Sequence, residues 1–169
     1  MLKIIQVETD AHFLQIRELM TEFREWDIEQ IKQWSLDPVK VVNFYYGTRN
    51  DSLPGLYAPP KGCLLLATDS DRAAGMVAFK PLSSNICELT RMYVRPEFRG
   101  KQLARHLIQM LIPKARESGH DIIRLETATF MQPAIALYSS FGFKIRPPYY
   151  EMPEEFLDST VFMELDISS

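Results

Sequence analysis

Several absences in this sequence exclude whole classes of protein. Only two cysteines and three histidines occur among the 169 residues, and the histidines show no metal-ligand spacing. No apolar run approaches the roughly 20 residues of a membrane span. The first residues also lack the basic region and long apolar core of an export signal. We therefore expect a cytoplasmic protein with reduced thiols, no metal and no membrane partner.

The sequence also lacks a surplus of positive charge. It has 19 Lys and Arg residues against 22 Asp and Glu residues, a net charge of −3, whereas a nucleic-acid-binding surface normally needs a basic excess. Hydrophobic residues make up 46% of the chain and charged residues 24%, the proportions of an ordinary folded domain. We therefore predict one domain over residues 1–169 that does not bind nucleic acid, with room for a local basic patch.

Hydrophobic periodicity predicts strands first and alternating strands and helices later. The predicted strands are Leu2–Glu8, Cys63–Thr68, Ala73–Leu82, Ile86–Val94, Asp121–Ala128, Phe143–Arg146 and Thr160–Asp166. The predicted helices are Ala11–Trp26, Ile28–Trp34, Val39–Tyr46, Gly100–Ser118 and Pro133–Phe141. A strand that follows a crossover helix lies parallel to its predecessor, so we expect an α/β (α+β) fold with one mixed sheet and helices on its faces.

Three single residues and the last strand carry further expectations. Cys63 and Cys87 fall in apolar strands and should be buried, unreactive thiols. His120 follows the glycine that stops a helix and should be solvated. Exposure of the last strand at the sheet edge would allow a homodimer.

A cluster of basic residues surrounds the predicted helix that begins at Gly100. Its members are Arg95, Arg99, Lys101 and Arg105. A helix N-terminus presents free backbone N–H groups and the positive end of the helix dipole, which suit a phosphate group. Glycine would let the backbone approach that group. The alternative is a basic helix start that is simply solvated.

The segment Arg99-Gly-Lys-Gln-Leu-Ala104 resembles the acyl-CoA signature of the GNAT superfamily of N-acetyltransferases, with Gln102 in place of the middle glycine. The segment Ala134–Phe143, with its Leu-Tyr-x-x-x-Gly-Phe ending, resembles a later motif of the superfamily. The strands that contain Glu88–Pro96 and Leu125–Thr127 resemble the strands on either side of the signature. The segments Leu53–Pro60 and Pro148–Tyr150 resemble one large bacterial branch of uncharacterised members, so the resemblance to the superfamily runs from about Leu53 to the C-terminus.

The resemblance implies a GNAT-like fold, with a mostly antiparallel sheet of about seven strands that splays at the strand pair around the cofactor. It also implies acetyl-CoA (coenzyme A) as co-substrate, without a metal. Pantetheine would pair with the strand edge at Met92, Tyr93 and Val94, and the pyrophosphate would be held by Arg99, Gly100, Lys101, Gln102, Leu103 and Ala104.

The resemblance also assigns catalytic residues. Tyr138 matches the general acid that protonates the departing thiolate, and its alternative is a core aromatic residue. Glu88 is the candidate base, acting directly or through water, and Glu126 is the second choice. If Glu88, Thr90 and Met92 share one strand face, the carboxylate lies near the thioester. The alternative for Glu88 is a salt bridge with a cation such as Arg124.

These features predict an N-acetyltransferase that moves an acetyl group from acetyl-CoA to a primary amine by direct attack in a ternary complex. The acceptor would be a small-molecule or peptide amine, bound between the first helices, the loop Gly47–Gly62 and the loop Pro147–Thr160. Two rivals remain. One is a non-catalytic, acyl-CoA-binding regulatory module, and the other is an acyltransferase for longer acyl chains.

Overall fold

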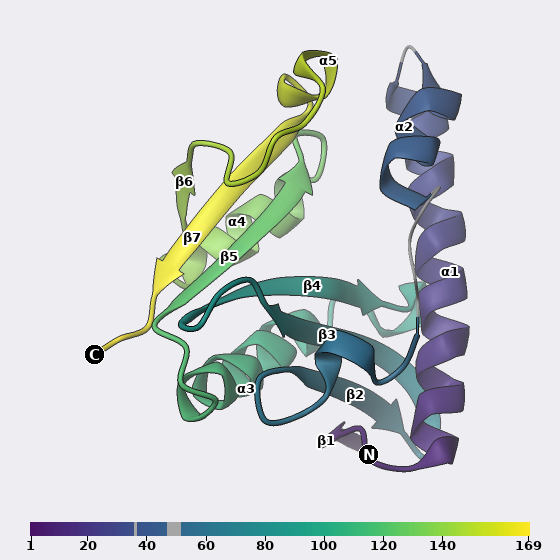
Figure 1. Ribbon diagram of the computed structural model, residues 1–169. Helices are drawn as coiled ribbons and strands as arrows, with labels where there is room; N and C mark the ends of the chain where they lie inside the picture. Colours follow the sequence, from purple (N-terminus) through teal and green to yellow (C-terminus); the bar gives the residue numbers. More distant parts are fainter. Residues whose placement is uncertain (36, 47–51) are drawn as a thin grey trace.

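Seven strands of the described chain form one sheet. The computed structural model describes residues 1–35, 37–46 and 52–169, and its strands follow the order β1-β2-β3-β4-β5-β7-β6 (Figure 1). Their bounds are β1 Leu2–Gln6, β2 Cys63–Asp69, β3 Arg72–Pro81, β4 Ile86–Val94, β5 Ile122–Ala128, β6 Lys144–Arg146 and β7 Thr160–Asp166. The predicted seven-stranded sheet is confirmed.

Neighbouring strands are antiparallel except β4 and β5, which are parallel. Helix α3 (Leu103–Glu117) connects these two strands, and such a crossover returns the chain in the same direction. The predicted mixed, mostly antiparallel sheet is therefore confirmed. The predicted exposure of the last strand is wrong, because β7 lies between β5 and β6 and the sheet ends at β1 and β6.

The other described helices are α1 Asp10–Trp34, α2 Pro38–Tyr46, α4 Gln132–Ser140, α5 Glu154–Leu157 and the 3₁₀ turns η1 Gly55–Tyr57 and η2 Pro96–Phe98. α1 is one helix where two were predicted, because neither glycine nor proline interrupts it. α5 lies in a stretch predicted to be a loop, and Phe156 is buried there. Of the predicted loop 47–62, residues 47–51 lie outside the described residues.

Helices cover both faces of the sheet, as predicted. Ile16 and Leu19 of α1 are fully buried in the core on one face. Leu107 and Leu111 of α3 are fully buried on the other face, and this second core extends to Tyr138 of α4. Within residues 1–35, 37–46 and 52–169, we find no helix whose length and apolar character suit a bilayer crossing.

β4 contains a bulge that changes which side chains share a face. Its register with β3 shifts between Thr90 and Tyr93, and Arg91 has a φ of +57°. An inserted residue reverses the alternation of side chains. Met92 therefore packs against the α3 side of the sheet, whereas Glu88 lines a cavity on the opposite side. The expectation that Glu88, Thr90 and Met92 share one face is wrong.

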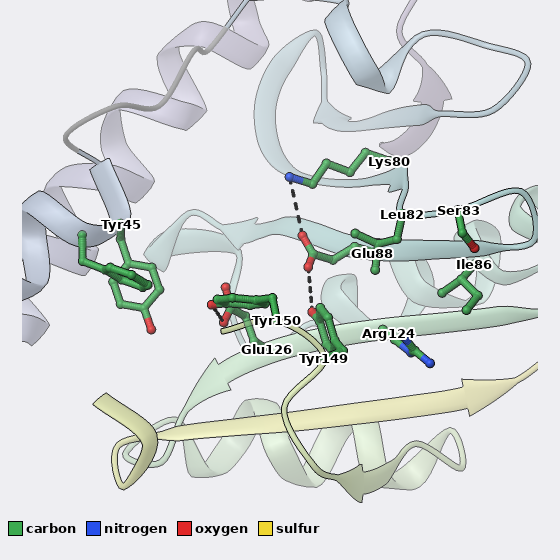
Figure 2. Close-up of a pocket in the computed structure, with 11 residues that line it drawn as sticks. Tyr45, Lys80, Leu82, Ser83, Ile86, Glu88, Arg124, Glu126, Tyr149 and Tyr150 are labelled. Atoms are coloured by element: carbon green, nitrogen blue, oxygen red, sulfur yellow. Dashed lines mark hydrogen bonds and ion pairs between the residues drawn. The ribbon is translucent and has the colours of Figure 1, made fainter. Parts of the chain in front are cut away.

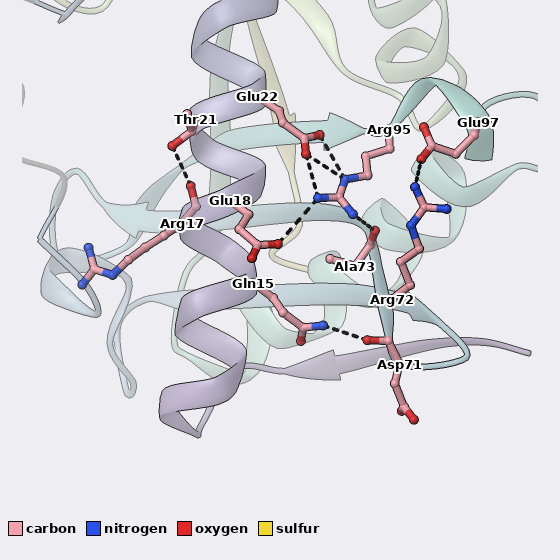
Figure 3. Close-up of polar contacts among 10 residues, drawn as sticks. All are labelled: Gln15, Arg17, Glu18, Thr21, Glu22, Asp71, Arg72, Ala73, Arg95 and Glu97. Carbon is pink, nitrogen blue, oxygen red and sulfur yellow. Dashed lines mark hydrogen bonds and ion pairs between the residues drawn. The ribbon is translucent and has the colours of Figure 1, made fainter.

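An arginine at the end of β4 ties the sheet to α1. Nε of Arg95 donates to the two carboxylate oxygens of Glu22 at 3.1 and 3.0 Å, and Nη2 donates to Oε1 at 2.7 Å (Figure 3). Nη1 donates to the carbonyl of Ala73 at 2.7 Å. Arg95 thus points toward α1, and the prediction that groups it with the cations around the start of α3 is wrong.

Candidate active site

The parallel strands β4 and β5 separate after a short pairing. Ile86–Glu88 pairs with Ile122–Arg124. Beyond these residues β5 remains paired with β7, while β4 remains paired with β3 as far as Val94. The sheet therefore opens into a fork, visible between β4 and β5 in Figure 1. Among the described strands, none pairs with the edge of β4 that faces this fork, which confirms the predicted splay.

The turn before α3 presents its backbone N–H groups to this region. Gly100 and Gln102 have φ values of +77° and +63°, and no N–H group between Gly100 and Arg105 donates to another group of the described chain. Consecutive N–H groups in such a turn form an anion-binding concavity. A Cβ atom built on Gly100 would meet nothing within 4 Å, so the space over the turn is open.

Three basic side chains remain around this turn, each in a different contact. Nε of Arg99 donates to the Val94 carbonyl at 3.0 Å, and the Arg99 guanidinium lies 5.6 Å from the centre of the Trp26 ring. Nζ of Lys101 lies over a neighbouring phenylalanine ring. Arg105 donates from Nε to Oε1 of Gln102 at 3.2 Å. The Gln102 side chain is thus engaged with the first turn of α3.

Tyr138 lies on the α3 side of the sheet, in the core that also contains Leu107 and Leu111 of α3. It is 5% exposed, and its ring meets the Phe143 ring edge-on with the centres 5.8 Å apart. Within the described residues its hydroxyl has no hydrogen-bond partner. Burial raises the pKa of Tyr138, so the hydroxyl stays protonated and can donate a proton or a hydrogen bond at neutral pH.

A cavity of about 550 Å³ lies on the other side of the sheet, beside the fork. Glu88 is the last β4 residue that pairs with β5, so the fork opens next to its carboxylate. Figure 2 shows the side chains around this cavity. The lining residues are Phe44, Tyr45, Lys80, Leu82, Ser83, Ile86, Glu88, Arg124, Glu126, Tyr149 and Tyr150.

Each of the two carboxylates in this cavity accepts a hydrogen bond from a tyrosine. The Tyr149 hydroxyl donates to Oε2 of Glu88 at 2.6 Å, and the Tyr150 hydroxyl donates to Oε2 of Glu126. Nζ of Lys80 lies 3.7 Å from Oε1 of Glu88. The cation beside Glu88 is therefore Lys80. Both predicted base candidates face one cavity, and Tyr138 lies on the opposite side of the sheet.

Sequence reasoning missed the two tyrosines as site residues. The aromatic pair after Pro147-Pro148 in a predicted loop was the available signal. The first helices and this loop were predicted to form the acceptor site. Side chains of α2 and of residues 149–150 do line the cavity. The acidic residues farther along the loop do not line it, and Glu155 is instead ion-paired with Lys40.

The buried sulfur and imidazole groups lie outside this site. Cys63 and Cys87 are 2% and 0% exposed, which confirms that both thiols are buried. Burial raises the pKa of Cys63 to about 11 and that of Cys87 to about 12. The expectation for His120 is wrong: it is 1% exposed, its Nε2 lies 2.9 Å from the Lys61 carbonyl, and its ring packs edge-on against Phe79.

Comparison with known proteins gives a consistent result. Residues 15–143 match the model of the acetyltransferase (GNAT) family. An uncharacterized N-acetyltransferase of Schizosaccharomyces pombe is 40% identical over 114 residues, which cover 66% of this chain and 68% of that protein. Two other N-acetyltransferase relatives are matched over only 37% and 58% of their length.

Solved structures show the same fold. A GNAT-family acetyltransferase from Staphylococcus aureus superposes with a TM-score of 0.70 at 18% identity, and the match covers 99% of each chain. A GNAT-family acetyltransferase from Elizabethkingia anophelis, with acetyl-CoA bound, superposes with a TM-score of 0.54 at 18% identity, over 63% of this chain and 76% of that one.

Proposed function

This chain belongs to the GNAT acetyltransferase family, and we propose that it transfers an acetyl group from acetyl-CoA to a primary amine within a ternary complex. One observation carries the proposal: the fork between β4 and β5 has an unpaired strand edge and free N–H groups on one side and a carboxylate-lined cavity beside it. The acetyl-CoA bound to the Elizabethkingia anophelis protein supports this choice of co-substrate.

The residues of the fork fit the parts of coenzyme A. The free N–H groups of the turn would hold the pyrophosphate, with Lys101 adding positive charge. Open space over Gly100 leaves room for the phosphate oxygens. Backbone groups on the free edge at Met92–Val94 would pair with the amides of the pantetheine arm. Such a grip places the far end of the arm in the fork.

The side chains around the fork can move the protons that the reaction requires. Acetyl-CoA supplies an acetyl group activated as a thioester. The neutral amine attacks the thioester carbonyl with the free electron pair of its nitrogen, and Glu88 takes, directly or through water, the proton that this nitrogen loses as the C–N bond forms. Tyr138 donates its hydroxyl proton to the sulfur as the C–S bond breaks, and solvent restores both groups. An N–H group of the β4 edge stabilises negative charge on the carbonyl oxygen.

A non-catalytic acyl-CoA-binding module is the rival function. It would need the turn and the strand edge, but it would have no use for paired carboxylates facing a cavity. The Glu88 and Glu126 side chains in one cavity, each with a tyrosine, therefore favour the enzyme. Glu126 remains the alternative base.

The test is release of free thiol from acetyl-CoA in the presence of tyramine, spermidine, lysine, glucosamine and an unblocked peptide. We expect at least one amine to accelerate release. With that amine, Tyr138→Phe should lower turnover by about tenfold or more. Binding of acetyl-CoA, measured by calorimetry, should be retained.

The phenylalanine variant also provides its own control for folding. It keeps the ring in the core and removes a hydroxyl that has no partner within the described chain, so its thermal stability should equal or exceed that of the wild type. Full activity of Tyr138→Phe would reduce Tyr138 to a packing residue. Thiol release that no amine accelerates would favour the binding module.

A further inference from the structure

The connection between β6 and α5 places two tyrosine hydroxyls on the two carboxylates of the cavity. Tyr149 donates to Glu88 at 2.6 Å, and Tyr150 donates to Glu126 (Figure 2). Glu88 is on β4 and Glu126 is on β5, so consecutive residues of one connection reach both sides of the fork. Neither tyrosine has a part in the mechanism given above.

The rings of these tyrosines are fixed by the sheet beneath them. The centres of the Tyr149 and Tyr150 rings lie 5.2 and 5.6 Å from the centre of the Phe162 ring on β7. The guanidinium of Arg124 lies 5.5 Å from the centre of the Tyr149 ring, and Arg124 is itself ion-paired with Glu164 on β7. The hydroxyl of Tyr149 is therefore held in one place before any acceptor binds.

Burial and the charge of the adjacent carboxylate raise the pKa of Tyr149, and burial and the hydrogen bond to Glu126 raise the pKa of Tyr150. Both hydroxyls therefore remain donors throughout the pH range in which a carboxylate base works. Of the two oxygens of Glu88, Oε2 accepts the hydrogen bond from the Tyr149 hydroxyl. Oε1 is 3.7 Å from Nζ of Lys80, beyond hydrogen-bonding distance, so Oε1 retains the capacity to accept a proton.

We propose that Tyr149 is a positioning residue, which holds the carboxylate of Glu88 through Oε2 and leaves Oε1 to accept the proton of the acceptor amine. The inference rests on the proposed function, because Glu88 acts there as the base. The charged and titratable groups around Glu88 are Lys80 from β3, Arg124 and Glu126 from β5, Tyr45 from α2, and Tyr149 and Tyr150 from the connection after β6. Of these groups, Tyr149 is the one that donates a hydrogen bond to Oε2 of Glu88.

The experiment compares Tyr149→Phe with the wild type over pH 5–9, using the amine from the panel that gives the fastest thiol release. A hydrogen bond from a hydroxyl stabilises a carboxylate over the protonated acid. Removal of the hydroxyl should therefore move the acidic limb of the kcat/KM profile upward by about one pH unit, with about tenfold lower kcat/KM on that limb. At alkaline pH the loss should largely disappear.

Tyr150→Phe is the matched control. The substitution removes the hydroxyl oxygen from the neighbouring tyrosine. The Tyr150 ring also packs on Phe162, but the Tyr150 hydroxyl is hydrogen-bonded to Glu126. The acidic limb should stay where it is in the wild type. An unmoved limb in Tyr149→Phe, or an equal shift in both variants, would overturn the inference. A shift in Tyr150→Phe alone would overturn it too and would identify Glu126 as the base.

A measurement without turnover tests the contact separately. In urea unfolding, Tyr149→Phe should lower the midpoint in the wild-type background and leave it nearly unchanged in a Glu88→Ala background, because the bond is already lost there. Equal effects in both backgrounds would show that the hydroxyl does not bind Glu88. If the wild type transfers acetyl to no amine of the panel, the proposed function fails and the positioning role fails with it, whatever the unfolding cycle shows.

Discussion

At the scale of single residues, Gln102 holds a conformation that suits glycine. Its φ of +63° and ψ of +15° are left-handed, and side chains with a Cβ adopt that region at a cost of about 1 kcal/mol or more. The GNAT signature, which the segment Arg99–Ala104 resembles, has glycine at the position of Gln102. This chain therefore keeps a left-handed backbone at that position although the residue is not glycine. The Gln102 side chain is exposed and accepts a hydrogen bond from Arg105.

Gln102→Gly should therefore raise the free energy of unfolding by about 0.5–1 kcal/mol. Glycine relieves the backbone strain of the folded turn, and the greater flexibility that it gives to the unfolded chain offsets part of this gain. Urea unfolding measures the change. Gln102→Ala is the control: it removes the amide but keeps the strain, so its stability should not increase. A less stable glycine variant would show that the contact with Arg105 outweighs the backbone strain.

At the scale of elements, one carboxylate joins the three strands on the far side of the fork. Glu164 on β7 accepts hydrogen bonds from Arg124 on β5 at 2.7 Å and from Arg146 on β6 at 2.5 Å. Burial tends to raise the pKa of Glu164, but the bonds from the two arginines outweigh burial and hold this pKa below its ordinary value. The interaction therefore stabilises the folded protein where Glu164 is ionised.

The sign of this linkage gives a pH-dependent prediction. A lowered folded-state pKa stabilises the protein above the unfolded pKa of about 4.3, and the contribution is lost as the pH falls through the folded value. Glu164→Gln should therefore cost about 1 kcal/mol at pH 7, measured by urea unfolding, and much less near pH 3.

Glu155→Gln serves as the control, because its pair with Lys40 is about half exposed on both sides, so its loss should change the free energy of unfolding much less than Glu164→Gln does. A cost for Glu164→Gln that is constant between pH 7 and pH 3 would contradict the assignment.

At the scale of the whole molecule, both thiols report on the folding of the sheet. Cys63 lies on β2 and Cys87 on β4, and both belong to the core beneath α3. β4 is the strand that joins the β1–β3 half to the fork. A reagent thus reaches these sulfurs only when that core opens.

The folded protein should accordingly give almost no reaction with a disulfide reagent at pH 8, because the thiolate is the reactive form and burial disfavours it. Both thiols should react within seconds in guanidinium chloride. The slow reaction in buffer should follow the stability of variants such as Glu164→Gln. Rapid labelling of either cysteine in the folded protein would show that this core opens locally.

Motifs carried by neighbouring residues could be predicted from the sequence, because local spacing decides them. Alternating apolar residues predicted the bounds of strands β4 and β7 without error, and the turn at Arg99–Ala104 lies at the start of α3 as expected. The splayed pair β4–β5 followed from the family resemblance. Helix α1 was divided wrongly at Asp27, because no glycine or proline interrupts the helix there and it continues to Trp34.

The contacts between distant segments depended on tertiary structure. Tyr149 and Glu88 are 61 residues apart in the chain, and only the order of strands in the sheet brings them together. One extra residue at Arg91 moves Met92 to the other face, which no pattern of alternation anticipates. The sequence by itself therefore determined the turn at Arg99–Ala104 and the family, whereas the folded sheet decided which side chains face the cavity beside the fork, because strand order and register set those neighbours.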